Sequence, residues 1–367
     1  MTLLVSTFYF CYFAIVGIYV IFMPKMFIDI GYSAVDVGII YAVAPLVRFV
    51  IPFIFAKFFT LSRTVFNMAL IVMSISTLLF ALYLEQFWIL LCINVFLGIG
   101  MALILPYIEV IALEHIGKEH YGRARLWGSV GFIVVALMLA KISTEIPFIL
   151  GSLIVTTFAT AVVGYVIVRS DSLKQQHAPS ATISFSLLSN PWLWVGFFLM
   201  QVSFGAFYNF FTIYETSHGV SLEWTVYLWS AAIVAEILLF YFQAPLLRKN
   251  LLLLLQFATV ITALRWSILW LYPDNLAMLF ISQTLHAISF ALFHAASISY
   301  LYTIYIDKKL AQQFFLGISY GLGSAVGAVG AGLIYEHYPE QLFIVAALVA
   351  LMAYVALRSS VVYDKRD

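Results

Sequence analysis

The chain has 367 residues, of which 64% are hydrophobic and only 10% are charged, and its formal net charge is +1. A soluble globular domain averages about 45–50% apolar and about 25% charged residues, so this composition excludes that class and requires a lipid bilayer as solvent. A net charge this close to zero also excludes a general electrostatic attraction to nucleic acid.

Twelve apolar stretches follow one another along the chain, and each is long enough for a helix that crosses a bilayer. The first has no basic residue before it and no small-residue cleavage site after it, so we interpret it as a retained span rather than a signal peptide. We expect the spans at residues 4–23, 34–57, 64–84, 87–112, 122–143, 147–168, 191–214, 222–247, 250–272, 275–304, 311–335 and 340–358. Proline or glycine residues such as Pro24, Gly31 and Pro273 mark many of the joins, as expected for turns.

A polar interval separates six spans from the other six. It covers residues 169–190, "RSDSLKQQHAPSATISFSLLSN", and is the longest polar stretch in the chain. We therefore expect an N-terminal half (1–168), a cytoplasmic linker (169–190) and a C-terminal half with a short tail (191–367). The halves show weak similarity when "YAVAPLVRF" (41–49) is laid over "WSAAIVAEI" (229–237), although apolar helices align with one another easily.

The basic residues predict the orientation. If the N-terminus is cytoplasmic, fourteen lysines and arginines fall in the inner loops and tail, whereas only Lys25 and Lys141 fall outside. Because loops rich in lysine and arginine stay in the cytoplasm, we expect both termini there and a multi-pass protein of the cell (inner) membrane. Cys11 and Cys92 are the only cysteines and both lie in apolar stretches, so we expect no disulfide framework and no cysteine metal site.

Four residues that can carry a charge lie well inside spans of the C-terminal half, away from the span ends. Glu236 is about 14 residues into its helix, or roughly 21 Å, which places it near the middle of the bilayer. Arg265, His286 and His294 lie in the next two spans. A charge at this depth is costly and usually faces a cavity or a partner. Arginine does not lose its proton near neutral pH, so Glu236 or a histidine would carry the proton and Arg265 would be the fixed countercharge. The alternative is a structural ion pair, or a histidine that only packs.

The N-terminal half holds three further candidates. Arg48 lies about nine residues before Lys57, inside the second span, and either binds an anionic group or pairs with an acid. Glu109 ends the fourth span and Arg125 begins the fifth, so the short connection between them would allow the two side chains to meet. The alternative is that both are loop charges at the level of the lipid headgroups.

Several stretches, in order along nearly the whole chain, resemble one branch of the major facilitator superfamily. The stretch "YGRARLWGSVGF" (121–132) is similar to the fifth-span motif of the branch that holds the lactose permease and the 3-phenylpropionate permease family. The other similar stretches are "GIYVIFMP", "LVRF", "YLWSAAIVAEILLF", "ALRWSI", "QTLHAISFALFH" and "GAGLIYEHY". The likeness is strongest to the phenylpropionate type, whose second-span arginine, eighth-span glutamate, ninth-span arginine and two tenth-span histidines all have counterparts here.

The resemblance implies an all-α integral membrane fold of twelve transmembrane helices in two six-helix bundles, with alternating access around a central site. It also implies that Arg125 binds the substrate and that Glu109 is its partner. The remaining residues that we expect at the substrate site are Arg48, Asn209, Tyr208, Phe132 and Tyr19.

Two departures from the lactose permease pattern matter. Phe132 stands where that protein has a stacking tryptophan, and Ser289 stands where it has its tenth-span proton-site glutamate. Proton coupling would therefore fall to Glu236, His286 or His294, with Arg265 as their partner. Asn209, within "YNFFT", could still meet a hydroxylated substrate.

These features predict a secondary transporter and not an enzyme. We expect a proton-coupled symporter that imports a small organic solute, with an aromatic carboxylate such as phenylpropionate favoured by the three arginines and many aromatic residues. The alternatives are a sugar or nucleoside symporter, an uncoupled uniporter or an efflux carrier. We expect a monomer with no cofactor and no metal, whose partners are the solute, protons and the bilayer. The sequence "GISYG" (317–321) matches a hydrolase motif but lies in an apolar helix with no strand before it.

Overall fold

The computed structural model describes residues 1–58, 62–170 and 187–364. Most of the predicted linker, 171–186, and the last three residues of the tail lie outside the described residues. Within the described part of the chain, 12 helical stretches are long and apolar enough to cross a membrane. The predicted all-helical membrane fold is therefore confirmed, and its spans correspond one by one to the expected stretches.

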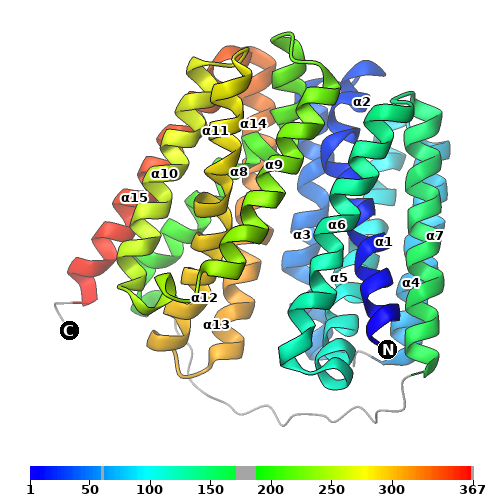
Figure 1. Ribbon diagram of the computed structural model, residues 1–367, viewed down its shortest axis with the longest axis horizontal. Helices are drawn as coiled ribbons and strands as arrows, with labels where there is room; N and C mark the ends of the chain where they lie inside the picture. Colours follow the sequence, from blue (N-terminus) through cyan, green and yellow to red (C-terminus); the bar gives the residue numbers. More distant parts are fainter. Residues whose placement is uncertain (59–61, 171–186, 365–367) are drawn as a thin grey trace. The chain divides into compact units, whose positions relative to one another are not determined.

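The chain forms two compact units. The first contains Met1–Tyr32 and the chain from Val43 to the end of α7 (Figure 1). Its helices are α1 (Thr2–Ile21), α2 (Met23–Asp29), most of α3 (Ala34–Phe58), α4 (Arg63–Leu82), α5 (Phe87–Ile116), α6 (Lys118–Ile142) and α7 (Ile146–Ser170). Helix α1 packs along α6 and α7, and α4 packs on α5 and α7. Because glycines line α6, the backbones approach closely, and a Cβ on Gly131 would collide with the carbonyl group of Phe10 on α1.

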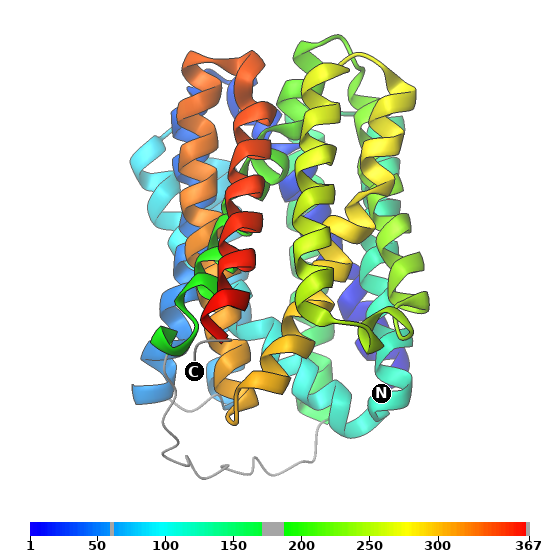
Figure 2. The same ribbon diagram turned by 90° about the vertical axis from the view of Figure 1, so that its left-hand side faces the viewer.

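The second unit contains Ser33–Ala42 and the chain from η1 onward. Its segments are η1 (Leu187–Ser189), α8 (Pro191–Ser217), α9 (Leu222–Phe242), η2 (Leu246–Arg248), α10 (Leu251–Leu271), α11 (Leu276–Thr284), η3 (Ala287–Leu292), α12 (Phe293–Ile304), α13 (Lys308–Phe315), η4 (Leu316–Gly323), α14 (Ser324–His337), η5 (Pro339–Gln341) and α15 (Leu342–Asp364). Helix α8 packs against α14 and α15, and α15 also packs along α10. Figure 2 shows α15 in red in front of this unit.

Two spans of the second unit are interrupted by π-helical turns. The turn η3 separates α11 from α12, and η4 separates α13 from α14. A π turn adds a residue to the helical repeat, so side chains after it face a different direction from the one that a regular helix predicts. Such turns often lie at functional sites, and η3 begins immediately after His286.

The observed elements differ from the sequence-based expectations in two places. The first span was expected to end before Pro24, but α2 begins around this proline and extends the span to Asp29. Proline is tolerated there because the first residues of a helix need no backbone N–H for internal hydrogen bonds. In addition, Ser33–Ala42 group with the second unit, and a Cβ on Gly38 would lie 2.6 Å from the carbonyl oxygen of Ala328 on α14. The division into 1–168 and 191–367 remains a prediction.

Candidate functional site

Arg265 is the centre of a buried polar cluster in the second unit. It lies on α10, its side chain is 0% exposed, and it donates hydrogen bonds in several directions. Its Nε donates to the carbonyl oxygen of Ser282 (3.1 Å), its Nη2 to Oε1 of Gln283 (2.9 Å) and its Nη1 to Oγ of Ser289 (3.3 Å). Nη1 also lies 2.9 Å from Nδ1 of His286. These acceptors from η3, α11 and the turn between them hold a guanidinium group that would otherwise be very costly to bury.

His286 connects Arg265 to Glu236. Its Nδ1 faces the guanidinium group, and its Nε2 lies 3.6 Å from Oε2 of Glu236 on α9. Because arginine has only donors, Nδ1 must be the unprotonated nitrogen of a neutral ring, which leaves the proton on Nε2, toward the carboxylate. The sequence-based expectation was a direct Glu236–Arg265 pairing, whereas the structure places the imidazole ring against both groups. Glu236 is 17% exposed and His286 only 2%, so the carboxyl is the more accessible end of this chain of contacts.

His294 forms a separate contact. Its Nδ1 lies 2.9 Å from the hydroxyl group of Tyr320 on η4. Phe290 lies between the two histidines, with ring centroids 5.2 Å from His286 and 6.4 Å from His294. Tyr320 lies close enough to Glu236 to interact with it electrostatically. The four predicted coupling residues are thus in one unit, with Arg265, His286 and Glu236 in contact and His294 two turns farther along the same span.

Aromatic rings surround the buried arginine. The guanidinium carbon lies 4.1 Å from the ring centroid of Phe207, which in turn packs against Trp229 at 4.4 Å. Tyr208 stacks on Phe204, with ring centroids 5.7 Å apart. Tyr208, expected at the substrate site, therefore lies beside the aromatic rings that surround Arg265. Asn209 is buried, and its side-chain amide donates to the carbonyl group of Gly205 one turn earlier on α8 (2.8 Å).

The first unit brings Glu109 and Arg125 together. Nε of Arg125 lies 3.7 Å from Oε1 of Glu109, and each side chain is 34% exposed. The hydroxyl group of Tyr121 also hydrogen-bonds Glu109. The guanidinium group of Arg125 lies over the ring of Phe13, 4.1 Å from its centroid, and 5.1 Å from that of Tyr9. The expected meeting of the two charges is confirmed, and it is supported by aromatic rings that a headgroup-level loop pair would not need.

The other predicted substrate residues of this unit lie in separate places, and their roles at the substrate site stay predictions. The hydroxyl group of Tyr19 donates to Oδ1 of Asn94 on α5 (2.9 Å), which links two helices. Phe132 is buried and its backbone lies against Gly17 of α1. Arg48 is exposed on α3. Whether it binds an anionic group or pairs with an acid stays a prediction.

Sequence reasoning missed several residues of the clusters. Gln283 is buried and accepts from Arg265, and its position three residues before His286 on one helical face could have identified it. Tyr320 belongs to "GISYG", which was considered only as a false hydrolase motif. Glu215 is fully buried in the last turn of α8, and nothing in the local pattern indicated that.

The described residues contain no group of three or more histidines, cysteines, aspartates or glutamates that could hold a metal ion. The two clusters differ in the groups that they present. The Glu109–Arg125 pair presents a cation beside aromatic rings, and the Glu236–His286–Arg265 cluster presents a titratable carboxyl whose charge is balanced through a neutral imidazole.

Comparisons with known proteins show the family and the fold of the chain. The model of the MFS_1 like family matches residues 2–345. A probable 3-phenylpropionic acid transporter of Escherichia coli (strain K12) is 26% identical over 373 residues, covering 96% of each chain. The crystal structure of the nucleoside transporter NupG has a TM-score of 0.78 at 15% identity and covers 98% of each chain. An auto-inhibited POT family peptide transporter has a TM-score of 0.74 at 11% identity, covering 100% of this chain and 97% of the other.

Proposed function

Because the chain belongs to the MFS_1 like family, a family of membrane transporters and not of enzymes, we propose that it is a proton-coupled symporter that imports a small organic solute by alternating access. The observation that supports coupling is the buried contact of Glu236 with His286 and of His286 with Arg265. A carboxyl group beside a histidine within a membrane can exchange a proton, and such groups are typical of proton pathways in transporters.

The proposed coupling step follows from the tautomer of His286. With Glu236 ionised, the Nε2–H of His286 points at the carboxylate, and Nδ1 accepts from Arg265. A proton that arrives on Glu236 removes the negative charge that this N–H faces. The ring and the carboxyl group then separate more easily, because the charge-assisted part of their attraction has been removed, while Arg265 keeps its acceptors on Ser282 and Gln283. Helix α9 could thus move relative to α10 and α11 only after protonation.

For the solute we propose a small aromatic carboxylate. Arg125, stacked on Phe13 and paired with Glu109, combines a cation with an aromatic surface. The relative named as a probable 3-phenylpropionic acid transporter supports this class. We further propose that Arg48 adds a second cation for the carboxylate, that the protein works as a monomer in the cell inner membrane, that both termini are cytoplasmic and that no cofactor is required.

The test is solute-driven proton movement in proteoliposomes that contain wild type or Glu236→Gln. Phenylpropionate, a sugar and a nucleoside are offered in parallel. We expect one class to drive proton entry in wild type, and Glu236→Gln to abolish proton entry and uphill accumulation while solute exchange continues.

The matched control is Glu223→Gln in the first turn of the same helix, where Glu223 accepts a hydrogen bond from Tyr227 (2.6 Å). It should retain proton entry. Accumulation that survives in Glu236→Gln would contradict the assignment of this carboxyl, and solute transport without proton movement in wild type would make the protein a uniporter or exchanger.

A further inference from the structure

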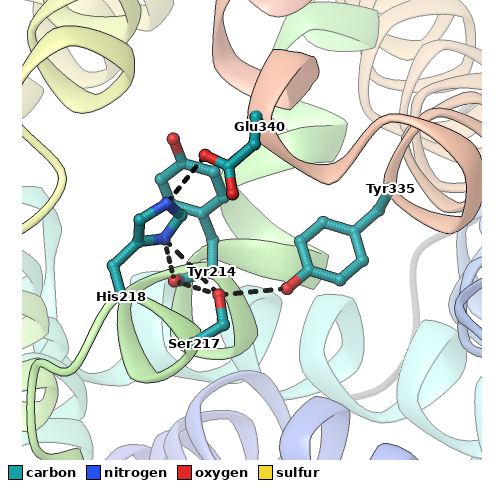
Figure 3. A network of polar contacts seen from close by, with 5 residues as sticks. All are labelled: Tyr214, Ser217, His218, Tyr335 and Glu340. Carbon is teal, nitrogen blue, oxygen red and sulfur yellow. Dashed lines mark hydrogen bonds and ion pairs between the residues drawn. The ribbon is translucent and has the colours of Figure 1, made fainter.

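A polar network at one end of the second unit plays no part in the proposed transport site. It joins the turn after α8 to η5, the short segment between α14 and α15 (Figure 3). His218 and Ser217 come from the end of α8, Tyr335 from α14 and Glu340 from η5. Under the proposed topology this end of the unit faces the outside of the cell.

The positions of the two ring nitrogens of His218 define its proton content. Nδ1 lies 2.8 Å from the carbonyl oxygen of Tyr214, which can only accept, so Nδ1 carries a hydrogen. Nε2 lies 3.0 Å from Oε2 of Glu340. In a neutral ring protonated on Nδ1, the Nε2 atom is itself an acceptor. Two acceptors do not approach to 3.0 Å without a proton between them.

We therefore propose that His218 and Glu340 form a proton-binding site, separate from the Glu236 cluster, that ties the end of α8 to η5. The bound proton lies between Nε2 and Oε2. Because the Glu340 side chain is 74% exposed and the His218 side chain only 16%, the proton is exchanged with the outside water through the carboxyl side.

Among the contacts described around His218, its contact with Glu340 is the one that depends on a bound proton. From α8, the ring of Tyr214 packs on the imidazole with centroids 4.3 Å apart, and Glu215 is buried next to it in the chain. Asp274 lines a surface pocket together with His218 and contributes a second acidic group. From α14, the hydroxyl group of Tyr335 donates to Oγ of Ser217 (3.3 Å). The Tyr335–Ser217 hydrogen bond contains no group that titrates near neutral pH. It therefore persists when the His218–Glu340 contact opens.

Loss of the proton has a defined consequence. At alkaline pH, the carboxylate and the bare Nε2 repel each other and the link to η5 opens, while the Nδ1–H bond to the Tyr214 carbonyl group keeps the ring in place. The closed His218–Glu340 contact binds one proton more than the open one. Its contribution to stability is therefore present in acid and is lost as the pH rises.

The experiment uses full-length protein with nitrogen-15 in its histidine rings, with His218→Gln identifying the signals of His218. At acid pH both ring nitrogens should carry hydrogen, and at alkaline pH only Nδ1 should. The Nδ1–H form at high pH is specific to this geometry. Observation of the Nε2–H form at high pH, or a ring that stays neutral throughout, would overturn the proposal.

Heat stability gives a second readout that needs no substrate. Because of the His218–Glu340 contact, the wild-type protein should melt about 2 °C higher in acid than at alkaline pH. A difference of this size is expected for one modest interaction in a unit of this length. Glu340→Gln and His218→Gln should each remove this increment, and the double variant should remove no more. Asp274→Asn, which removes a nearby charge but not the contact, should keep it. A Glu340→Gln protein with the wild-type pH dependence would refute the site, whatever the outcome of the transport experiment.

Discussion

At the scale of single residues, Glu215 has an unusual environment for an acidic side chain. It is 0% exposed in the last turn of α8, and within the described chain neither of its carboxyl oxygens has a hydrogen-bond partner. By contrast Thr212, three residues earlier, is also buried but accepts a hydrogen bond from Nε1 of Trp229 (3.1 Å). A polar group that is buried without a partner costs free energy, whereas one that is paired does not.

We therefore predict opposite effects of two apolar substitutions on the same helix. Glu215→Leu replaces an unpaired polar side chain with an apolar one of similar size. It should raise the free energy of unfolding by about 1–3 kcal/mol. Thr212→Val removes the acceptor of the indole N–H of Trp229 and should lower the free energy of unfolding by about 1–3 kcal/mol. Thermal melting of both variants in one detergent checks this. A Glu215→Leu protein that melts below wild type would show that this carboxyl has a partner in the working protein.

At the scale of helices, close backbone approach explains how α8 and α14 pack. A Cβ on Gly327 of α14 would lie 2.6 Å from the carbonyl oxygen of Val202, and one on Gly205 would collide with the backbone of Gly327. Gly330, three residues along α14, has nothing within 4 Å of its Cβ position. Small residues at this spacing let membrane helices approach, so only some of the glycines in "GLGSAVGAVGAG" are needed for packing.

Gly327→Ala and Gly330→Ala should therefore have different effects on the stability of the second unit. The first forces α8 and α14 apart and should destabilise the second unit by at least about 1–3 kcal/mol, the usual cost of overpacking. The second fills open space and should be neutral or stabilise by about 0.5–1 kcal/mol, because alanine favours a helix more than glycine does. The yield of monodisperse protein and its melting temperature distinguish the two variants. Equal effects would mean that α8 and α14 do not pack as described.

At the scale of the whole molecule, the distribution of basic residues predicts which loops face the cytoplasm. Asp274, in the turn between α10 and α11, belongs to the side with few basic residues, and Lys249, between η2 and α10, belongs to the other. Both side chains are exposed, so a cysteine at either position would be accessible to a reagent from one side of the membrane.

In a protein whose Cys11 and Cys92 have been replaced by serine, we expect Asp274→Cys to react with a membrane-impermeant maleimide in intact cells. Lys249→Cys should react only after the membrane is opened, because lysine- and arginine-rich loops remain inside. Labelling of Lys249→Cys in intact cells, with Asp274→Cys protected, would reverse the proposed topology and place the His218–Glu340 site in the cytoplasm.

The helical class, the twelve spans and the charges within them could all be predicted from the amino-acid sequence. The physical reason is that a bilayer accepts only long apolar helices and penalises every charge, so length and composition alone identify both. The meeting of Glu109 and Arg125 could also be predicted, since a short connection joins their helices.

Which polar atoms are in contact could not be predicted from the sequence, because these contacts depend on how the helices pack. Helices that are apolar on all sides have no polar stripe to indicate their rotation, so the sequence did not show that His286 stands against both Glu236 and Arg265. The π turn after His286 changes the facing of the residues that follow, which regular periodicity does not anticipate. The same reason applies to Glu215 and to the His218–Glu340 contact, whose partners lie 122 residues apart and meet only because α8 and α14 pack together.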